Sequence, residues 1–342
     1  KKILYFAAVA VCASSLSSCE SFLDTTNYWS KTTEDFPANQ ADAEQILTGI
    51  YNNLNVSIGN NVHQNHFLWS LAASDDCLGG GGANDHAMQA HDLLLNFGAN
   101  LYEGFYKDRY TGIARANVAI ETFANCGLDE ATLNQYLGEA YFLRSFFLFD
   151  LTQLCGEIPL VSSVPSSVSD AAQYPEQASI EEIYGTIAAG LKQAIEIMPS
   201  NRWDACISGL RHATKWDAEA LLARVYLFYT GFYSDKNSTT ITELPLVDLK
   251  TGEVLAETVK KDYVIEKLND CIQNSGHELV SDFRLMWSYT NSATKKDYAY
   301  AQQVEGTWIT DDVNPEAMFQ ICVTNLAESS RFCNKYNQYL GV

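Results

Sequence analysis

The sequence predicts a mainly α-helical fold of tetratricopeptide-like helix pairs with long inserted loops. Apolar side chains recur at helical spacing in long segments, and capping signals mark the starts of several of them. One helical segment is also repeated 80 residues further along the chain. Because 47% of the 342 residues are hydrophobic and only seven are proline, such helices can bury a large core.

Each predicted helix has its own signal. Apolar residues spaced three and four apart begin at Ala43 and predict the first helix, and bulky residues at similar spacing predict the second. Asp129 is the expected cap of the third, while Ser179 and Thr214 open two more with capping-box patterns. The predicted helices cover residues 43–54, about 100–124, 130 to about 154, 180–198, 215 to about 233 and about 262–274.

The internal repeat relates two of these helices. Residues 139–149 align without gaps to residues 219–229, and both segments carry Glu-Ala, then Arg, then bulky side chains. A small residue followed by bulky ones is typical of the packing face in tetratricopeptide-like pairs. The spacing exceeds the usual repeat of about 34 residues, so we expect long loops at roughly 155–178 and 199–211. Such loops usually serve binding.

The amino terminus has the order of a secretory signal peptide. Lys1 and Lys2 precede an apolar run over residues 3–13, which is shorter than the roughly 20 residues that span a bilayer. The following Leu-Ser-Ser-Cys sequence, which ends at Cys19, resembles a bacterial lipobox, whose Cys is diacylated and becomes the first mature residue. Such acylation exceeds the two-chain requirement for stable anchoring, so we expect membrane attachment through the lipid alone.

These features divide the chain. We expect a signal peptide at residues 1–18, a lipidated tether and extended segment at 19–41, and a helical domain at 42–342. Glu20 and Asp24 resemble the acidic tag by which Bacteroidetes-type bacteria send lipoproteins to the cell surface. The expected location is therefore the outer membrane, with the protein facing the cell exterior.

Charge and missing motifs exclude several functions. Acidic residues outnumber basic ones by 42 to 22, the wrong sign for a nucleic-acid partner. Nucleophile-elbow, phosphate-loop, dinucleotide and zinc-protease motifs are absent from the sequence. A metal site at His63, His66, His86 and His91 is disfavoured because no Cys or Glu completes its spacing. Seven mature cysteines besides Cys19 are widely spaced, which favours buried thiols over a metal or redox motif.

A set of short motifs follows in order along nearly the whole chain, at residues 19–24, 42–54, 115–117, 139–146, 154–160, 191–194, 211–215, 220–227 and 314–319. Through these motifs the sequence resembles the SusD/RagB family of outer-membrane nutrient-binding lipoproteins. The resemblance implies the helix-pair fold, contact with a SusC-like TonB-dependent transporter, and a loop-rich face that holds a glycan or other nutrient without catalysis or cofactor. Family members continue well beyond the Asn-Pro-Glu element at 314–316, so we expect part of the carboxy-terminal region to be missing.

Candidate ligand-binding residues follow from sugar chemistry. Sugar rings stack their C–H faces on flat aromatic side chains, while their hydroxyls need polar partners. Loop aromatics are better candidates than Trp69, Trp203 and Trp216, which we expect to pack against helices. The predicted ligand-binding residues are Trp287, Tyr289 and Trp308 in loops, and Asn84, Asp85 and His86 beside the run of four glycines at 79–82.

Two alternatives remain open. A helical-repeat adaptor would have a protein-binding groove and no glycan affinity. A glycosidase would need two inward-facing carboxylates on separate elements, about 5–10 Å apart across one cleft. Adjacent acids such as Asp75 and Asp76 do not meet this condition, because neighbours in sequence point apart. We therefore expect a binding protein and no enzymatic activity.

Overall fold

The mainly α-helical prediction is confirmed by the computed structural model. It describes residues 36–59, 103–163, 175–209, 211–286, 299–302, 309 and 314–320. The long helices of this part are α3 (Gln40–Gly59), α6 (Glu103–Thr122), α7 (Glu130–Cys155), α9 (Ile180–Ile197), α10 (Lys215–Asn237) and α11 (Lys261–Asn274). Shorter elements are the 3-10 turns Phe123–Asn125, Trp203–Ala205 and Phe283–Met286, and α13 (Ala299–Gln302).

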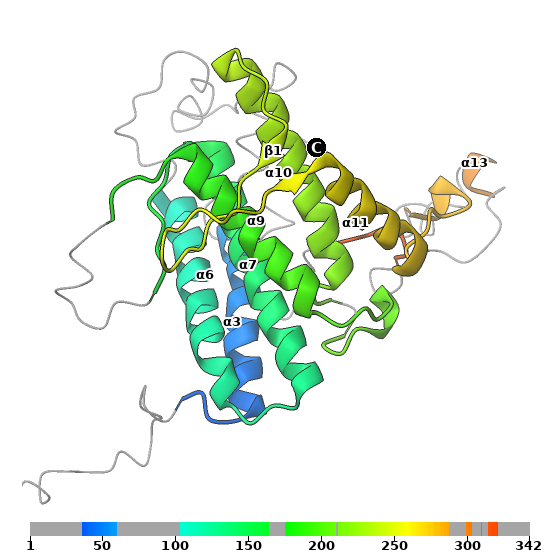
Figure 1. The fold of residues 1–342 in the computed structure, drawn as a ribbon. Coiled ribbons are helices and arrows are strands. Elements are labelled where there is room, and N and C mark those ends of the chain that lie inside the picture. Colours follow the sequence, from blue (N-terminus) through cyan, green and yellow to red (C-terminus); the bar gives the residue numbers. More distant parts are fainter. Residues whose placement is uncertain are drawn as a thin grey trace, which may run out of the picture.

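The long helices stack in chain order. Each of α6, α7, α9, α10 and α11 packs against the long helix before it, and α7 also contacts α3. Figure 1 shows α3, α6 and α7 side by side, with α9 next to them and α11 outside α10. The two helices that carry the internal repeat, α7 and α10, each pack against the long helix before them and the long helix after them. This serial packing is the arrangement of helix-pair repeats.

The predicted caps are present. Asp129 accepts a hydrogen bond from the Thr132 backbone N–H at 3.0 Å, and Ser179 and Thr214 each form a complete capping box. Helix α7 ends at Gly156, whose positive φ of 74° suits glycine. Helix α10 continues four residues beyond the predicted end at Tyr233.

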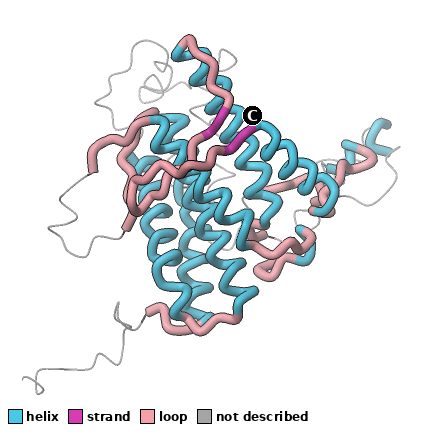
Figure 2. The backbone as a smooth tube through the Cα atoms, viewed as in Figure 1, coloured by secondary structure: helices cyan, strands magenta, loops and turns pink. Residues whose placement is uncertain are grey.

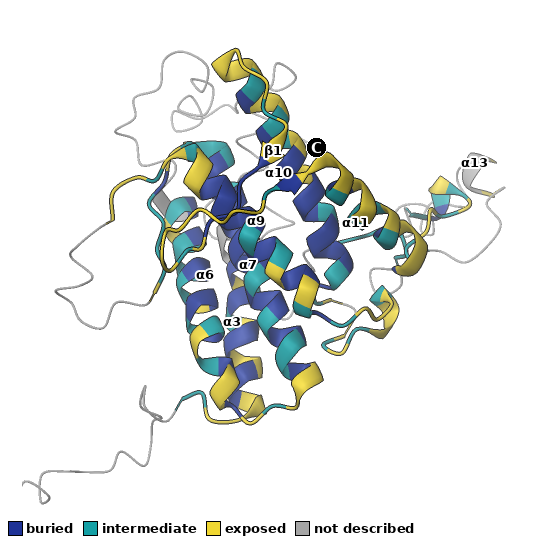
Figure 3. Cartoon of the chain, in the orientation of Figure 1, coloured by how far each residue is buried: buried dark blue, intermediate teal, exposed yellow. Residues whose placement is uncertain are grey.

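The core lies between the stacked helices (Figure 3). The largest fully buried side chains include Trp216, Tyr184 and Phe105. Around Tyr184 the rings of Phe149, Phe228, Tyr229 and Tyr233 lie within 5.1–6.2 Å, centroid to centroid. Burying one such ring contributes about 2–3 kcal/mol, so this cluster is a major part of the adhesion between α7, α9 and α10. Trp216 is buried, and its indole N–H donates to the Asn201 carbonyl at 2.7 Å.

One element was not predicted. Strands β1 (Glu243–Leu244) and β2 (Val259–Lys260) pair antiparallel, and a bridge between Val247 and Val254 continues their pairing. We call residues 243–260 the hairpin; in Figure 2 its two short strands lie beside the helices. Its Val247 N–H donates to the Gly185 carbonyl of α9 at 3.1 Å. A side chain at Gly185 would overlap Val247, so glycine permits this close approach.

A buried polar cluster ties α3 to α7. The Glu139 carboxylate is fully buried and accepts hydrogen bonds from the Tyr51 hydroxyl at 2.7 Å and the Gln135 amide at 2.8 Å. His212 Nδ1 lies 2.8 Å from the same carboxylate. Burial alone would lower the pKa of His212, but its hydrogen bond to Glu139 and the charge of that carboxylate raise it. We call Tyr51, Gln135, Glu139 and His212 the Glu139 cluster.

The matching glutamate in α10 lacks such partners. Glu219 is 1% exposed, and neither carboxylate oxygen has a hydrogen-bond partner among the described residues. Lys215 Nζ lies 3.7 Å away but is held 2.8 Å from Asp270 of α11. Burial, opposed by Lys215, raises the pKa of Glu219 to about 8.

Candidate functional site

The residues that the sequence singles out for function lie outside the described part of the chain. They are the lipid-attachment residue Cys19 and the ligand-binding candidates Asn84, Asp85, His86, Trp287, Tyr289 and Trp308. The disfavoured metal site at His63, His66, His86 and His91 lies there as well. All of these stay predictions, so the site is built here from the residues that the structure places.

A polar hollow lies between α7, α9 and the hairpin, and we call it the α7–α9 cleft. Its floor is the seam between the two helices, which approach closely at Gly190, where a side chain would overlap Ser145 of α7. The hairpin forms its wall through residues 246–249, 255 and 257. The cleft has a volume of about 260 Å³.

Two polar groups in the α7–α9 cleft are buried without partners. Arg144 is 7% exposed and donates from Nη1 to the Asn117 side-chain oxygen at 3.0 Å, but its Nε has no hydrogen-bond partner among the described residues. The Thr186 hydroxyl, 3% exposed, has no partner there either. Burial lowers the pKa of Arg144 to about 10, while Tyr141 and Asp248 oppose this shift, so the side chain keeps its charge at neutral pH.

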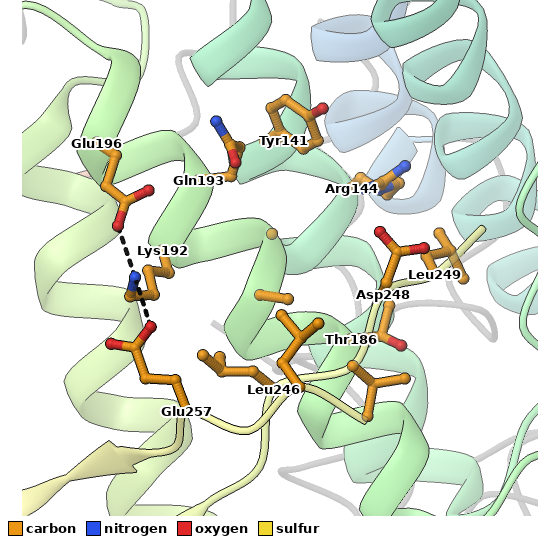
Figure 4. A pocket seen from close by; sticks show the side chains of 14 residues that line it. Tyr141, Arg144, Thr186, Lys192, Gln193, Glu196, Leu246, Asp248, Leu249 and Glu257 are labelled. Atoms are coloured by element: carbon orange, nitrogen blue, oxygen red, sulfur yellow. Dashed lines mark hydrogen bonds and ion pairs between the residues drawn. The ribbon is translucent and has the colours of Figure 1, made fainter. Parts of the chain in front are cut away.

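The two ends of the cleft differ in charge pairing (Figure 4). At one end, Lys192 of α9 bridges Glu196 at 2.6 Å and Glu257 of the hairpin at 3.2 Å. At the other, Arg144 lies near Asp248, whose Oδ1 accepts hydrogen bonds from the Lys250 and Thr251 backbone N–H groups. The exposed carboxylate of Asp248, whose pKa is lowered by its hydrogen bonds to Thr251, thus lies beside the buried guanidinium of Arg144.

A second hollow lies where the 203–214 loop meets residues 277 and 314–320. The Trp203 ring stacks on His277 at 5.2 Å and its indole N–H donates to the Gly276 carbonyl, so Trp203 packs on a loop rather than a helix. His277 Nε2 and Asp217 Oδ1 have no partners among the described residues. The volume of about 20 Å³ suits one ordered water molecule.

A third, mainly apolar hollow of about 500 Å³ lies between α7, α10 and residues 318–319. Phe319 packs edge-on against Phe142 at 4.9 Å and Phe146 at 5.5 Å on one side of it. Arg224 of α10 lies on its border. The described polar groups of this hollow are too few to fix the orientation of a sugar ring.

The α7–α9 cleft was missed from the sequence because its wall is the hairpin. Val247 and Val254 flank a turn that contains Gly252 at a φ of 70°, which is a hairpin signal. Arg144 was recognised only as part of the repeated motif. Nothing in a single sequence indicates that its guanidinium would be buried next to a cavity.

No metal centre accompanies these sites in the part of the chain that the structure describes, since no three His, Cys, Asp or Glu side chains converge there. The described cysteines, Cys126, Cys155, Cys206 and Cys271, are free thiols. Within the same residues, no helix is both long and apolar enough to cross a membrane.

A family model described as starch-binding and associating with the outer membrane matches residues 21–227, more than half of the chain. The chain belongs to the SusD-like family. A curated SusD-like relative, protein P38 of Formosa agariphila, is 26% identical over 280 residues, which is 79% of this chain and 50% of the relative.

Solved structures agree with this SusD-like fold. Surface glycan-binding protein A from Bacteroides fluxus is 26% identical, with a TM-score of 0.54 over 73% of this chain and 48% of its own. A SusD homologue from Bacteroides thetaiotaomicron is 20% identical, with a TM-score of 0.61 over 87% of this chain and 50% of its own. The chain therefore spans about half the length of these relatives.

Proposed function

We propose that the protein is a cell-surface lipoprotein that captures a glycan and delivers it to a SusC-like TonB-dependent transporter of the outer membrane. The observation that carries this proposal is the family match over residues 21–227, whose description names starch binding and association with the outer membrane. The names of relatives support it, since one solved neighbour is a surface glycan-binding protein.

Attachment to the membrane follows from the predicted lipobox. In this proposal, residues 1–18 are removed, Cys19 carries the lipid, and residues 19–41 form the tether to the helical domain. Removal of the first 18 residues takes two lysines and no acid, which leaves 20 basic against 42 acidic residues. Anionic membrane lipids repel a protein of this charge. The lipid on Cys19 therefore holds the protein at the membrane while the surface of the helical domain stays accessible.

We propose that the protein binds its glycan without hydrolysing it. The carboxylates at one end of the α7–α9 cleft, Glu196 and Glu257, are both held by Lys192. A glycosidase requires one carboxyl that holds a proton and a second that is free to act as nucleophile or base. Here the same ammonium engages both carboxylates, so neither is free for such a role.

Glycan affinity can be tested by electrophoresis through gels that contain one polysaccharide each. We would use the 342-residue chain with Cys19→Ser, which cannot be lipidated, and the variants Trp287→Ala and Trp308→Ala. We expect retardation by one glycan and its loss in at least one of these variants, with the circular dichroism spectrum unchanged.

Delivery needs a separate test. We expect the lipidated protein to co-purify with a TonB-dependent transporter from its native outer membrane, and the Cys19→Ser protein not to be found in that membrane. A folded protein that no glycan retards and that no transporter accompanies would contradict the proposed function.

A further inference from the structure

The hollow between α7, α10 and residues 318–319 combines an apolar lining with one accessible charge, and we call it the α7–α10 hollow. Its volume of about 500 Å³ lies within the range of about 300–1,000 Å³ that is typical of small-molecule sites. Phe146, Ala220, Met318 and Phe319 line it and are each partly exposed. A molecule in the hollow can therefore touch these side chains directly.

The walls of the α7–α10 hollow suit an aliphatic or aromatic body. On α7, Phe142 and Phe146 lie one turn apart, and on α10, Ala220 and Arg224 lie one turn apart on the face that lines the hollow. Phe319 packs edge-on against both phenylalanines and leaves part of its own ring exposed. Apolar surface of this kind gains free energy when an apolar ligand covers it.

Arg224 is an accessible cation at the border of this apolar surface. Its side chain is exposed, and no ion pair, hydrogen bond or ring contact engages it in the described part of the chain. A free guanidinium can form two parallel hydrogen bonds with a carboxylate. The other arginines of the described residues all have such partners; they are Arg109, Arg115, Arg144, Arg202, Arg211 and Arg284.

The charges around the hollow favour an acid over an amine. Among the described residues that line it, the one acidic side chain is Asp217, which is 3% exposed and is hydrogen-bonded to Thr214. An ammonium would therefore meet Arg224 and no accessible carboxylate. Asp217 lies seven residues before Arg224, about 10 Å along the helix axis, so an apolar body can cover Ala220 while its acid pairs with Arg224.

We propose that the α7–α10 hollow binds a small amphiphilic acid, whose aliphatic or aromatic body lies between Phe146, Ala220 and Phe319 and whose carboxylate pairs with Arg224. This ligand class differs from the glycan of the proposed function, because the hollow has too few polar groups to hold a sugar ring. The inference does not depend on glycan binding, and the two can be tested separately.

The experiment measures the fluorescence of anilinonaphthalene sulfonate, an aromatic anion that reports apolar binding surface. Decanoate and decylammonium, which share one alkyl chain and differ in charge, compete with it below their micelle-forming concentrations. The full chain with Cys19→Ser is compared with Arg224→Gln, which removes the charge, and Ala220→Phe, which fills the hollow from α10. Arg202→Gln is the matched control, because it removes the same charge from an exposed arginine that does not line the hollow.

We expect decanoate to displace the probe more effectively than decylammonium does. Arg224→Gln should weaken binding of the probe and of decanoate about 3- to 10-fold, the effect of one lost charge-assisted contact at an accessible position. Ala220→Phe should weaken both as well, because its ring occupies the space of the apolar body. Arg202→Gln should bind both as the unsubstituted protein does, and all proteins should have the same circular dichroism spectrum.

Two kinds of result would overturn the inference. If decylammonium competes as well as decanoate, or if Arg224→Gln binds the probe without loss, the hollow does not select acids. If the folded protein does not bind the probe, or if Ala220→Phe binds it unchanged, the hollow is not the binding site. Retardation in the polysaccharide gels is a separate measurement, so either result leaves the proposed glycan function standing or failing on its own evidence.

Discussion

Glu139 of α7 and Glu219 of α10 occupy the same position of the repeated motif, yet their surroundings differ. Glu139 accepts hydrogen bonds from Tyr51 and Gln135 and lies beside His212, so residues from α3 and the 209–214 loop meet at one carboxylate. Glu219 is equally buried, but its carboxylate has no hydrogen-bond partner among the described residues. Its nearest cation, Lys215, is held by Asp270.

This difference shows how one sequence motif serves two structural roles. In the first pair, the buried glutamate is hydrogen-bonded and fixes three segments to one another. In the second, the carboxyl is driven toward its neutral form, because a buried charge without close partners is costly. The repeated arginines diverge in the same way, since Arg144 is buried and Arg224 is exposed. The motif therefore specifies helix packing, and the flanking segments decide what its polar residues do.

The largest effect is expected at Glu139. Glu139→Gln keeps the shape of the side chain but removes the charge and one acceptor, so Tyr51, Gln135 and His212 compete for the remaining oxygen. We expect a loss of about 3 kcal/mol in the free energy of unfolding. Chemical denaturation measures it, with Glu219→Gln as the matched control. If Glu139→Gln were no less stable than Glu219→Gln, the proposed difference between the two sites would be contradicted.

Glu219→Gln should raise the free energy of unfolding, and the size of this gain should depend on pH. The pKa of Glu219 is raised from 4.5 to about 8, so the folded protein keeps this proton over a range in which the unfolded chain releases it. Stability from this group therefore falls as pH rises from about 4.5 to about 8. The amide cannot ionise, so we expect the variant to gain roughly 1–3 kcal/mol over the natural protein between pH 5 and pH 8.

Urea denaturation of both proteins at pH 5, 6.5 and 8 checks this prediction. Because burial also raises the pKa of Asp217 to about 7, the natural protein and the variant share that second pH dependence, and only the difference between them reports Glu219. A difference that stays constant with pH would mean that Glu219 is not neutral in the folded protein.

The smallest expected effect is the difference in stability lost when the N-cap of α7 or the N-cap of α10 is replaced by alanine. Thr214 is 6% exposed, and its hydroxyl and backbone N–H pair with buried Asp217 at the start of α10. Asp129 caps α7 at an exposed position. We expect Thr214→Ala to lower the free energy of unfolding by about 1–2 kcal/mol and Asp129→Ala to lower it by less, by thermal denaturation at pH 7. The reverse order would show that burial of the cap does not strengthen it.

Much of the helical fold could be predicted because its signals are local. Three helix starts are indicated by the N-cap residues Asp129, Ser179 and Thr214 together with the next three residues. The apolar spacing that begins at Ala43 identifies α3. Local signals do not predict burial, however. The capping-box residue Asp217 is buried because of packing between distant segments, which no local pattern indicates. The hairpin was missed because its paired strands are only two residues long.

The site was less predictable because it depends on contacts between distant segments. The α7–α9 cleft joins Arg144 to Asp248, 104 positions later, through a close approach that depends on Gly185 and Gly190. Local sequence indicates that Arg144 lies on a helix but not what faces it. The aromatic candidates Trp287, Tyr289 and Trp308 were chosen for loop position and ring chemistry, and they remain predictions.

The attachment of the hairpin has a consequence for motion at the cleft. The described contacts that fix its wall include the backbone hydrogen bond from Val247 to Gly185 and the ion pair of Glu257 with Lys192. The hairpin also buries Leu244, Leu246 and Val259 in the core, whereas its turn at residues 250–253 is exposed and can open locally far more often than the helical core unfolds. The amides of this turn should therefore exchange with deuterated solvent well before those of α7, so the rim of the cleft can move while its buried wall and the stacked helices stay intact.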